Sequence, residues 1–97
     1  MGKLRFSWDP RKAASNERKH GISFDEATTV FLDERALLLD DPDHSEDEVR
    51  FLLLGLSSFM RLLVVCHCIR EGDTIRLINA RKATKQEKRQ YQERLRK

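Results

Sequence analysis

Residues 61–79, which read RLLVVCHCI, REGD and TIRLIN in succession, decide the fold. The first and last segments are rich in aliphatic and β-branched residues, which is typical of strands. The segment between them carries a glycine and polar side chains, so it predicts a tight turn. We therefore expect a hairpin of two antiparallel strands at residues 61–69 and 74–79.

Further strands are predicted on the N-terminal side of this hairpin. Residues 37–39 and 49–56 are strand-like runs separated by an acidic loop at residues 40–47. The alternating segment at residues 4–8 predicts a short first strand. Short turns between the later runs favour a small antiparallel sheet.

Three helices are predicted by their end signals. Asp9 followed by a proline begins the first helix, which should run to about Lys19 before Gly21 ends it. Residues 23–26 (SFDE) and 84–87 (TKQE) are capping boxes that open a second and a C-terminal helix. The order β-α-α-β-β-β-β-α predicts an α+β fold, with the N-terminal helices and the C-terminal helix packed on the sheet. We expect one domain over residues 1–97.

Composition and charge narrow the function classes. The 97 residues are 39% hydrophobic and 36% charged, with a net charge of +3. The longest apolar run, residues 62–66, is far too short to span a membrane, and the first ten residues hold no apolar signal core. Residues 25–50 hold ten acidic side chains, whereas residues 1–24 and 76–97 hold a basic excess. We expect a cytoplasmic protein whose basic ends bind a polyanion.

The Cys66-His67-Cys68 segment does not predict a metal site. Strand alternation places His67 on the opposite face from the two thiols, and thiols two residues apart on one strand are poorly placed to form a disulfide. We expect core thiols, a half-exposed histidine, and neither a metal nor a cofactor.

The chemistry-bearing candidates are basic side chains. Lys12, Asn16, Lys19 and His20 fall at helical spacing and should share one face of the first helix. The alternative is a solvated face whose basic residues complement the helix dipole.

Arginines form a second group of candidates, on three expected neighbouring strands. Guanidinium groups from adjacent strands can converge on one phosphate, which predicts a phosphate site. Arg81 precedes the basic helix, and its alternative role is a structural pair with an acid. Trp8 is either a base-stacking side chain or a core residue. The candidate arginines are Arg50, Arg61, Arg76 and Arg81.

Five segments together resemble one known family. They are FSWDPRK (6–12), NERKHGISFDEA (16–27), HSEDEVR (44–50), RLLVV (61–65) and IRLINARKATKQEKRQY (75–91). In order and spacing they resemble the BrnT family of ribonuclease toxins, which pair with BrnA antitoxins in bacterial type II modules. Two positions depart from the family pattern: serine is usual where Asn79 stands, and glycine is commoner at Met60.

The resemblance implies a RelE-like fold, cleavage of cellular RNA, and neutralisation by a BrnA-like ribbon-helix-helix antitoxin. It also implies that promoter DNA is bound only through the antitoxin complex, and that no membrane is involved. Whether the toxin forms a homodimer within that complex is left open.

Metal-free RNA cleavage needs a base for the 2′-OH, an acid for the leaving oxygen, and cations for the phosphorane. Histidine titrates near neutral pH, so His20 is the candidate base or acid. The second proton-transfer group is left open among Glu48, His44 and Tyr91. The predicted catalytic residues are His20, Arg50, Arg61, Arg81 and Glu48. The predicted RNA-binding residues are Lys12, Lys19, Arg76, Lys85, Lys88 and Arg89.

Two other functions fit the same residues. One is a nucleic-acid binder without catalysis, which would show salt-dependent binding and no strand scission. The other is a protein-interaction module that uses the basic helix at residues 84–97. Tyr91 and Leu95 are the only strong apolar side chains of this helix, which suits docking to a partner.

Overall fold

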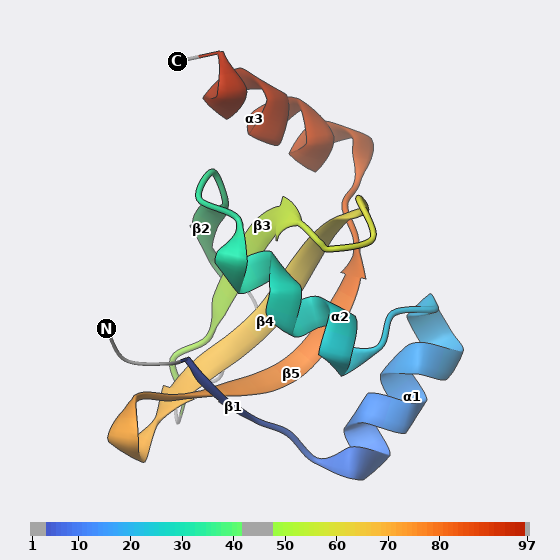
Figure 1. Ribbon diagram of the computed structural model, residues 1–97, viewed down its shortest axis with the longest axis vertical. Coiled ribbons are helices and arrows are strands. Elements are labelled where there is room, and N and C mark those ends of the chain that lie inside the picture. The colour runs from blue at the N-terminus through green and yellow to red at the C-terminus, as the bar shows by residue number, and fades with distance from the viewer. Residues whose placement is uncertain (1–3, 42–47, 97) are drawn as a thin grey trace.

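Five strands form one mixed sheet in the computed structural model, which describes residues 4–41 and 48–96. The order of elements is the predicted one, and the α+β class is confirmed. The elements (Figure 1) are β1 (Arg5–Ser7), α1 (Pro10–His20), α2 (Phe24–Thr29), the 3-10 helix η1 (Val30–Leu32), β2 (Leu37–Asp40), β3 (Phe51–Leu56), β4 (Leu62–Arg70), the 3-10 helix η2 (Glu71–Asp73), β5 (Thr74–Lys82) and α3 (Lys85–Leu95).

The strands lie in the order β1-β5-β4-β3-β2. The last four in sequence pair antiparallel, as predicted, whereas β1 runs parallel to β5 and pairs only along residues 74–76. The expectation of a wholly antiparallel sheet is therefore wrong for β1. The alternation of residues 4–8 identifies a strand, but its partner lies about seventy residues away and cannot be inferred from local pattern.

The two faces of the sheet carry separate apolar clusters. Helix α2 covers one face and α1 lies beside β5 (Figure 1). On this face Phe24 and Ile22 pack against residues of β4 and β5 such as Leu63 and Leu77. The Trp8 and Phe24 rings pack edge to face with their centroids 5.8 Å apart, which supports a core role for Trp8. On the other face a smaller cluster forms around Leu54, Val64, Ala83 and Tyr91.

The helix ends follow the local signals. The Asp9 carboxylate accepts a hydrogen bond from the backbone N–H of Arg11 at 2.8 Å, and Gly21 ends α1 in the left-handed conformation with φ of 70°. At α3 the full capping box forms between Thr84 and Glu87. Helix α3 lies beyond the end of the sheet at which β5 finishes (Figure 1).

The Cys66–Cys68 segment is more buried than predicted. His67 is buried rather than half-exposed, because its ring packs edge-on against Phe31 at 4.9 Å. Burial, with Asp41 beside it, raises the pKa of the Cys66 thiol to about 12. Within residues 4–41 and 48–96, no group of three or more acidic, cysteine or histidine side chains is arranged to hold a metal ion. Among the same residues no helix is long and apolar enough to cross a membrane.

Candidate active site

A pocket of about 300 Å³ lies between α1 and β5. It brings together the predicted basic residues of α1, since Lys12, Lys19 and His20 all line it. Asn79 of β5 lines the other side of the pocket. It lies next to a β-bulge-like position at which the register between β4 and β5 shifts. The remaining lining residues are Ser15, Asn16 and Ile78.

Asn16 holds α1 against the sheet. Its amide nitrogen donates to the carbonyls of Ala80 at 2.9 Å and Ile22 at 3.0 Å, and its amide oxygen accepts from the Ala80 N–H at 3.0 Å. Strand β1 ends its pairing at Arg76, so this side chain takes the place of a neighbouring strand at the edge of β5. The interpretation of this helix face as solvated is therefore wrong for Asn16, which is buried.

Arg61 lies where α1 ends. Its Nη2 donates at 3.2 Å to the carbonyl of Gly21, the residue after His20. Its Nε donates to Glu26 Oε2 at 2.9 Å, and Nη2 also contacts Glu26 Oε1. The Ser57 hydroxyl donates to the same carboxylate at 2.7 Å. The hydrogen bond from Arg61 holds the pKa of Glu26 below its ordinary value despite burial.

Arg81 is held by a different glutamate. Its Nη1 and Nη2 donate to the two carboxylate oxygens of Glu87 at 2.8 and 3.0 Å, so the structural pair that was its alternative role is formed. The pair lowers the pKa of Glu87 to about 2. Register places Arg81 opposite Val64, so it faces away from α2 at the same end of the sheet as Arg61.

Glu48 and Arg50 lie at the other end of the sheet. Arg50 Nε donates to Glu48 at 3.3 Å, and Arg70 Nη2 donates to it at 3.0 Å. Arg76 pairs with Cys68 at that end. Strand β4 is nine residues long and runs from Leu62, next to Arg61, to Arg70, so its two ends are roughly 26 Å apart. The structure therefore does not bring Glu48 or Arg50 to the pocket that His20 lines. Arg76 lies three residues before Asn79 in β5 and is not among the residues that line this pocket.

The remaining candidates are on or near α3. Lys85, Lys88 and Arg89 are exposed on this helix. The Tyr91 hydroxyl donates to Asp33 at 2.6 Å, and burial together with this carboxylate raises the pKa of Tyr91 to about 12. Tyr91 thus anchors α3 and is a poor proton donor near neutral pH. His44 lies outside the described residues.

Sequence reasoning missed Glu26, Ser57 and Lys82. Glu26 was assigned to a capping box, and nothing local indicates that an arginine thirty-five residues away would hold it. The positive charge of Lys82 also lowers the pKa of Glu26, so this lysine belongs to the same cluster of charges.

Comparison with known proteins decides the family. Residues 8–87 match the family described as the ribonuclease toxin BrnT of type II toxin–antitoxin systems. The chain belongs to the BrnT family. This confirms the resemblance, and the matched range includes His20, Arg61 and Arg81. No curated protein matches the sequence.

A solved BrnT structure has the same fold. The crystal structure of the Brucella abortus ribonuclease toxin BrnT superposes with a TM-score of 0.65 at 19% sequence identity, covering 86% of this chain and all of that chain. Membership of a type II family implies a protein antitoxin and an RNA target for this chain.

Proposed function

We propose that this BrnT-family chain is a metal-independent endoribonuclease that cuts cellular RNA and so inhibits translation and growth. The observation that carries the proposal is the pocket between α1 and β5, where His20 lies beside Lys12 and Lys19 within the matched range. A histidine among exposed cations suits proton transfer next to a bound phosphate.

In the proposed reaction the 2′-OH attacks the adjacent phosphorus, and the products are a 2′,3′-cyclic phosphate and a 5′-OH. His20 takes the proton of the 2′-OH. Tyr91 is committed to Asp33, Glu48 lies at the far end of the sheet, and His44 lies outside the described residues. We propose that the acid for the leaving oxygen is a lysine of the pocket, Lys12 or Lys19, with His44 as the alternative. Arg61, fixed by Glu26, offsets the charge that develops on the phosphorane oxygens.

The other predicted residues take roles away from the scissile bond. Arg81 lies at the same end as Arg61 and contacts a neighbouring phosphate when it exchanges Glu87 for substrate. The exposed cations of α3 attract the RNA backbone without reading its sequence. Arg50 and Arg76, at the opposite end of the sheet, contact RNA that extends beyond the cut.

The partner proposed for this toxin is a BrnA-like ribbon-helix-helix antitoxin in the cytoplasm. Promoter DNA is then bound by the antitoxin of the complex. This part of the proposal is supported by the type II family match.

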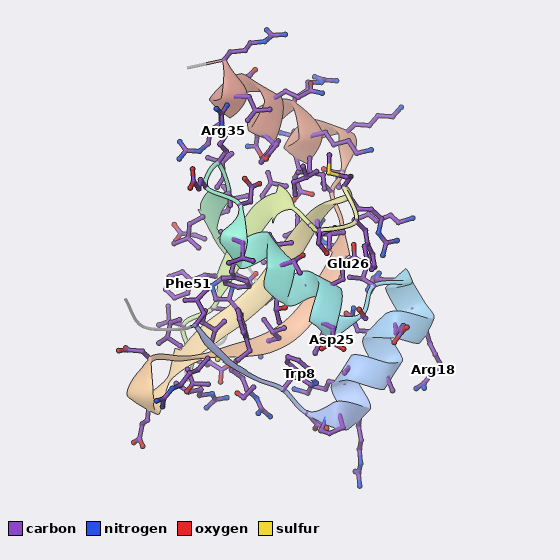
Figure 2. The ribbon with its side chains drawn as sticks, in the orientation of Figure 1. Trp8, Arg18, Asp25, Glu26, Arg35 and Phe51 are labelled. Carbon is purple, nitrogen blue, oxygen red and sulfur yellow. The ribbon has the colours of Figure 1, made fainter. Side chains whose placement is uncertain are left out.

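The test is incubation of antitoxin-free protein with a labelled single-stranded RNA in excess EDTA. We expect cleavage with cyclic-phosphate ends, and none of an all-deoxy strand of the same sequence. His20→Ala should abolish most of the cleavage. Arg18→Ala is the matched control, because Arg18 is an exposed cation of α1 outside the pocket (Figure 2).

Three outcomes would contradict the proposal in different ways. Loss of cleavage in EDTA that returns with a divalent cation would show a metal-dependent enzyme. Salt-dependent RNA binding without scission would favour a binder or a ribosome-dependent enzyme, and translating ribosomes would separate these. Full activity of His20→Ala would remove His20 from the mechanism.

A further inference from the structure

Three apolar side chains lie exposed at the tip of the β3–β4 hairpin and the end of η1. Leu32 is 75% exposed, Phe59 68% and Met60 76%, and we call these three residues the hairpin patch. The backbone N–H of Ser58 donates to the Thr29 hydroxyl at 2.8 Å, which joins the hairpin to the end of α2. The patch therefore draws its residues from two elements that are distant in sequence and held together by this bond.

A pocket of about 320 Å³ borders the hairpin patch at Leu32. Leu32 forms one side, and Ser58, which precedes Phe59, forms the other. A concave site with apolar edges is suited to receive a side chain of a protein partner. The full lining is Thr29, Leu32, Asp33, Leu56, Ser57 and Ser58.

Met60 is strained as well as exposed. Its φ is +61°, in the left-handed region that favours glycine, and its side chain gains little from burial in the free chain. The fold thus obtains no stability from Met60 in return for its backbone conformation. Unfavourable backbone geometry at an exposed apolar residue points to a contact made outside the chain.

Charges of both signs surround the hairpin patch. Arg61 follows Met60 directly in the chain. The Arg35 N–H donates to the pocket residue Asp33 at 3.0 Å, and Arg94 of α3 donates to the Arg35 carbonyl at 3.1 Å. Asp33 itself already accepts hydrogen bonds from Leu56 and Tyr91. The exposed side chains of Arg35 and Arg94 outnumber the exposed carboxylate of Glu34, so a partner with acidic residues beside its apolar ones would complement this excess of positive charge.

We propose that the hairpin patch binds the protein antitoxin, through an antitoxin segment in which apolar side chains are flanked by acidic ones. The aliphatic and aromatic side chains of the patch offer a phosphate backbone no hydrogen bonds, which favours a protein over RNA. The proposal rests on the toxin–antitoxin pairing of the proposed function and is independent of how RNA is cut.

The chain offers a matched pair of variants. Asp73 is the other described non-glycine residue with positive φ, at +59°, and it is exposed in η2 at the far end of the hairpin formed by β4 and β5. Met60→Gly and Asp73→Gly therefore relieve the same backbone conformation at two sites. We expect neither variant to lower the Tm of the isolated toxin.

The measurement is the Kd for a purified BrnA-like antitoxin. We expect Met60→Gly to weaken binding by roughly tenfold or more, and Asp73→Gly to leave the Kd unchanged. Phe59→Ser and Leu32→Asn test the remaining residues of the patch and should also weaken binding. Equal affinities of Met60→Gly and Asp73→Gly would overturn the proposal, as would wild-type binding by both Phe59→Ser and Leu32→Asn.

RNA cleavage by the same variants separates the two proposals. Met60→Gly should cut RNA at the wild-type rate in the absence of antitoxin. Lost cleavage with unchanged antitoxin affinity would assign the patch to RNA and overturn the antitoxin role. A wild-type protein that cuts no RNA would refute the proposed catalysis, while the comparison of antitoxin affinities would still decide this one.

Discussion

Helices α2 and α3 begin with the same kind of four-residue pattern, yet the glutamate at its end bonds differently in each. In α3, Glu87 accepts the Thr84 N–H at 2.8 Å, closes the capping box and also holds Arg81. In α2, Ser23 still caps the N–H of Glu26 at 3.1 Å, but the Glu26 carboxylate is bonded to Arg61 and Ser57.

Burial accounts for this difference. The Glu26 side chain is 1% exposed, against 15% for Glu87, because the β3–β4 hairpin closes over α2. Burying a carboxylate costs free energy unless strong donors bond it, and a guanidinium or a hydroxyl group offsets this cost better than a solvent-exposed backbone N–H. A capping-box sequence therefore predicts where a helix begins, but not which groups its glutamate bonds.

The largest expected contrast between the two pairs is in catalysis. We expect Arg61→Ala to lower RNA cleavage by about 10²–10³-fold, a typical loss for a group that stabilises transition-state charge. Arg81→Ala should lower it by about tenfold, because Arg81 faces away from α2, whereas Arg61 bonds to the residue after His20. Single-turnover rates measure both effects, and a larger loss for Arg81→Ala would reverse the assignment.

A second contrast is in stability. Glu26→Ala should cost about 2–3 kcal/mol, because it leaves the Ser57 hydroxyl and the Arg61 guanidinium without their acceptor. Glu87→Ala should cost about 1 kcal/mol, since it removes a cap and a partly exposed ion pair. Urea unfolding measures both values, and equal costs would show that burial does not separate the two glutamates.

The hydroxyl of Ser57 provides a smaller effect on the α2 side alone. Ser57→Ala should cost about 1 kcal/mol, because the hydroxyl donates to Glu26 and accepts from the backbone of the hairpin. Ser58→Ala is the control, since the Ser58 side chain is exposed and only its backbone bonds to Thr29. The two unfolding curves should differ, and coincident curves would exclude a role for the hydroxyl.

The last expected effect is a pH dependence on the α3 side. The pKa of Glu87 falls from its ordinary 4.5 to about 2, so its ionised form stabilises the fold. This contribution is complete above about pH 5 and is lost as the pH falls toward the folded pKa. The gap in unfolding free energy between wild type and Glu87→Gln should therefore narrow from about pH 5 to pH 3. A constant gap would mean that the charge of Glu87 does not contribute.

Local signals predicted the elements but not their distant partners. The Asp9-Pro10 start and the Gly21 end of α1 depend on neighbouring residues, so their positions could be predicted from sequence. The parallel pairing of β1 with β5 and the hydrogen bonds of Asn16 to Ala80 connect residues more than sixty positions apart. The periodic pattern of apolar residues in the sequence does not indicate contacts between such distant residues.

The candidate site follows the same division. Helical spacing was enough to place Lys12, Lys19 and His20 together, because side chains three or four positions apart, or one such step further, lie on the same face of a helix. The predicted convergence of Arg50 with Arg61 depended on strand register and on the length of β4, and the structure separates these two arginines. Contacts within one helix were predictable, whereas contacts across the sheet were not.

The amide of Asn16 has a consequence for the toxin when it is separated from its partner. By bonding both the N–H and the carbonyl of Ala80, it leaves this part of the β5 edge closed to a strand from another molecule. The same bonds fix the turn of α1 that carries His20. The free toxin therefore protects itself from edge-to-edge aggregation with the side chain that also aligns its proposed catalytic histidine.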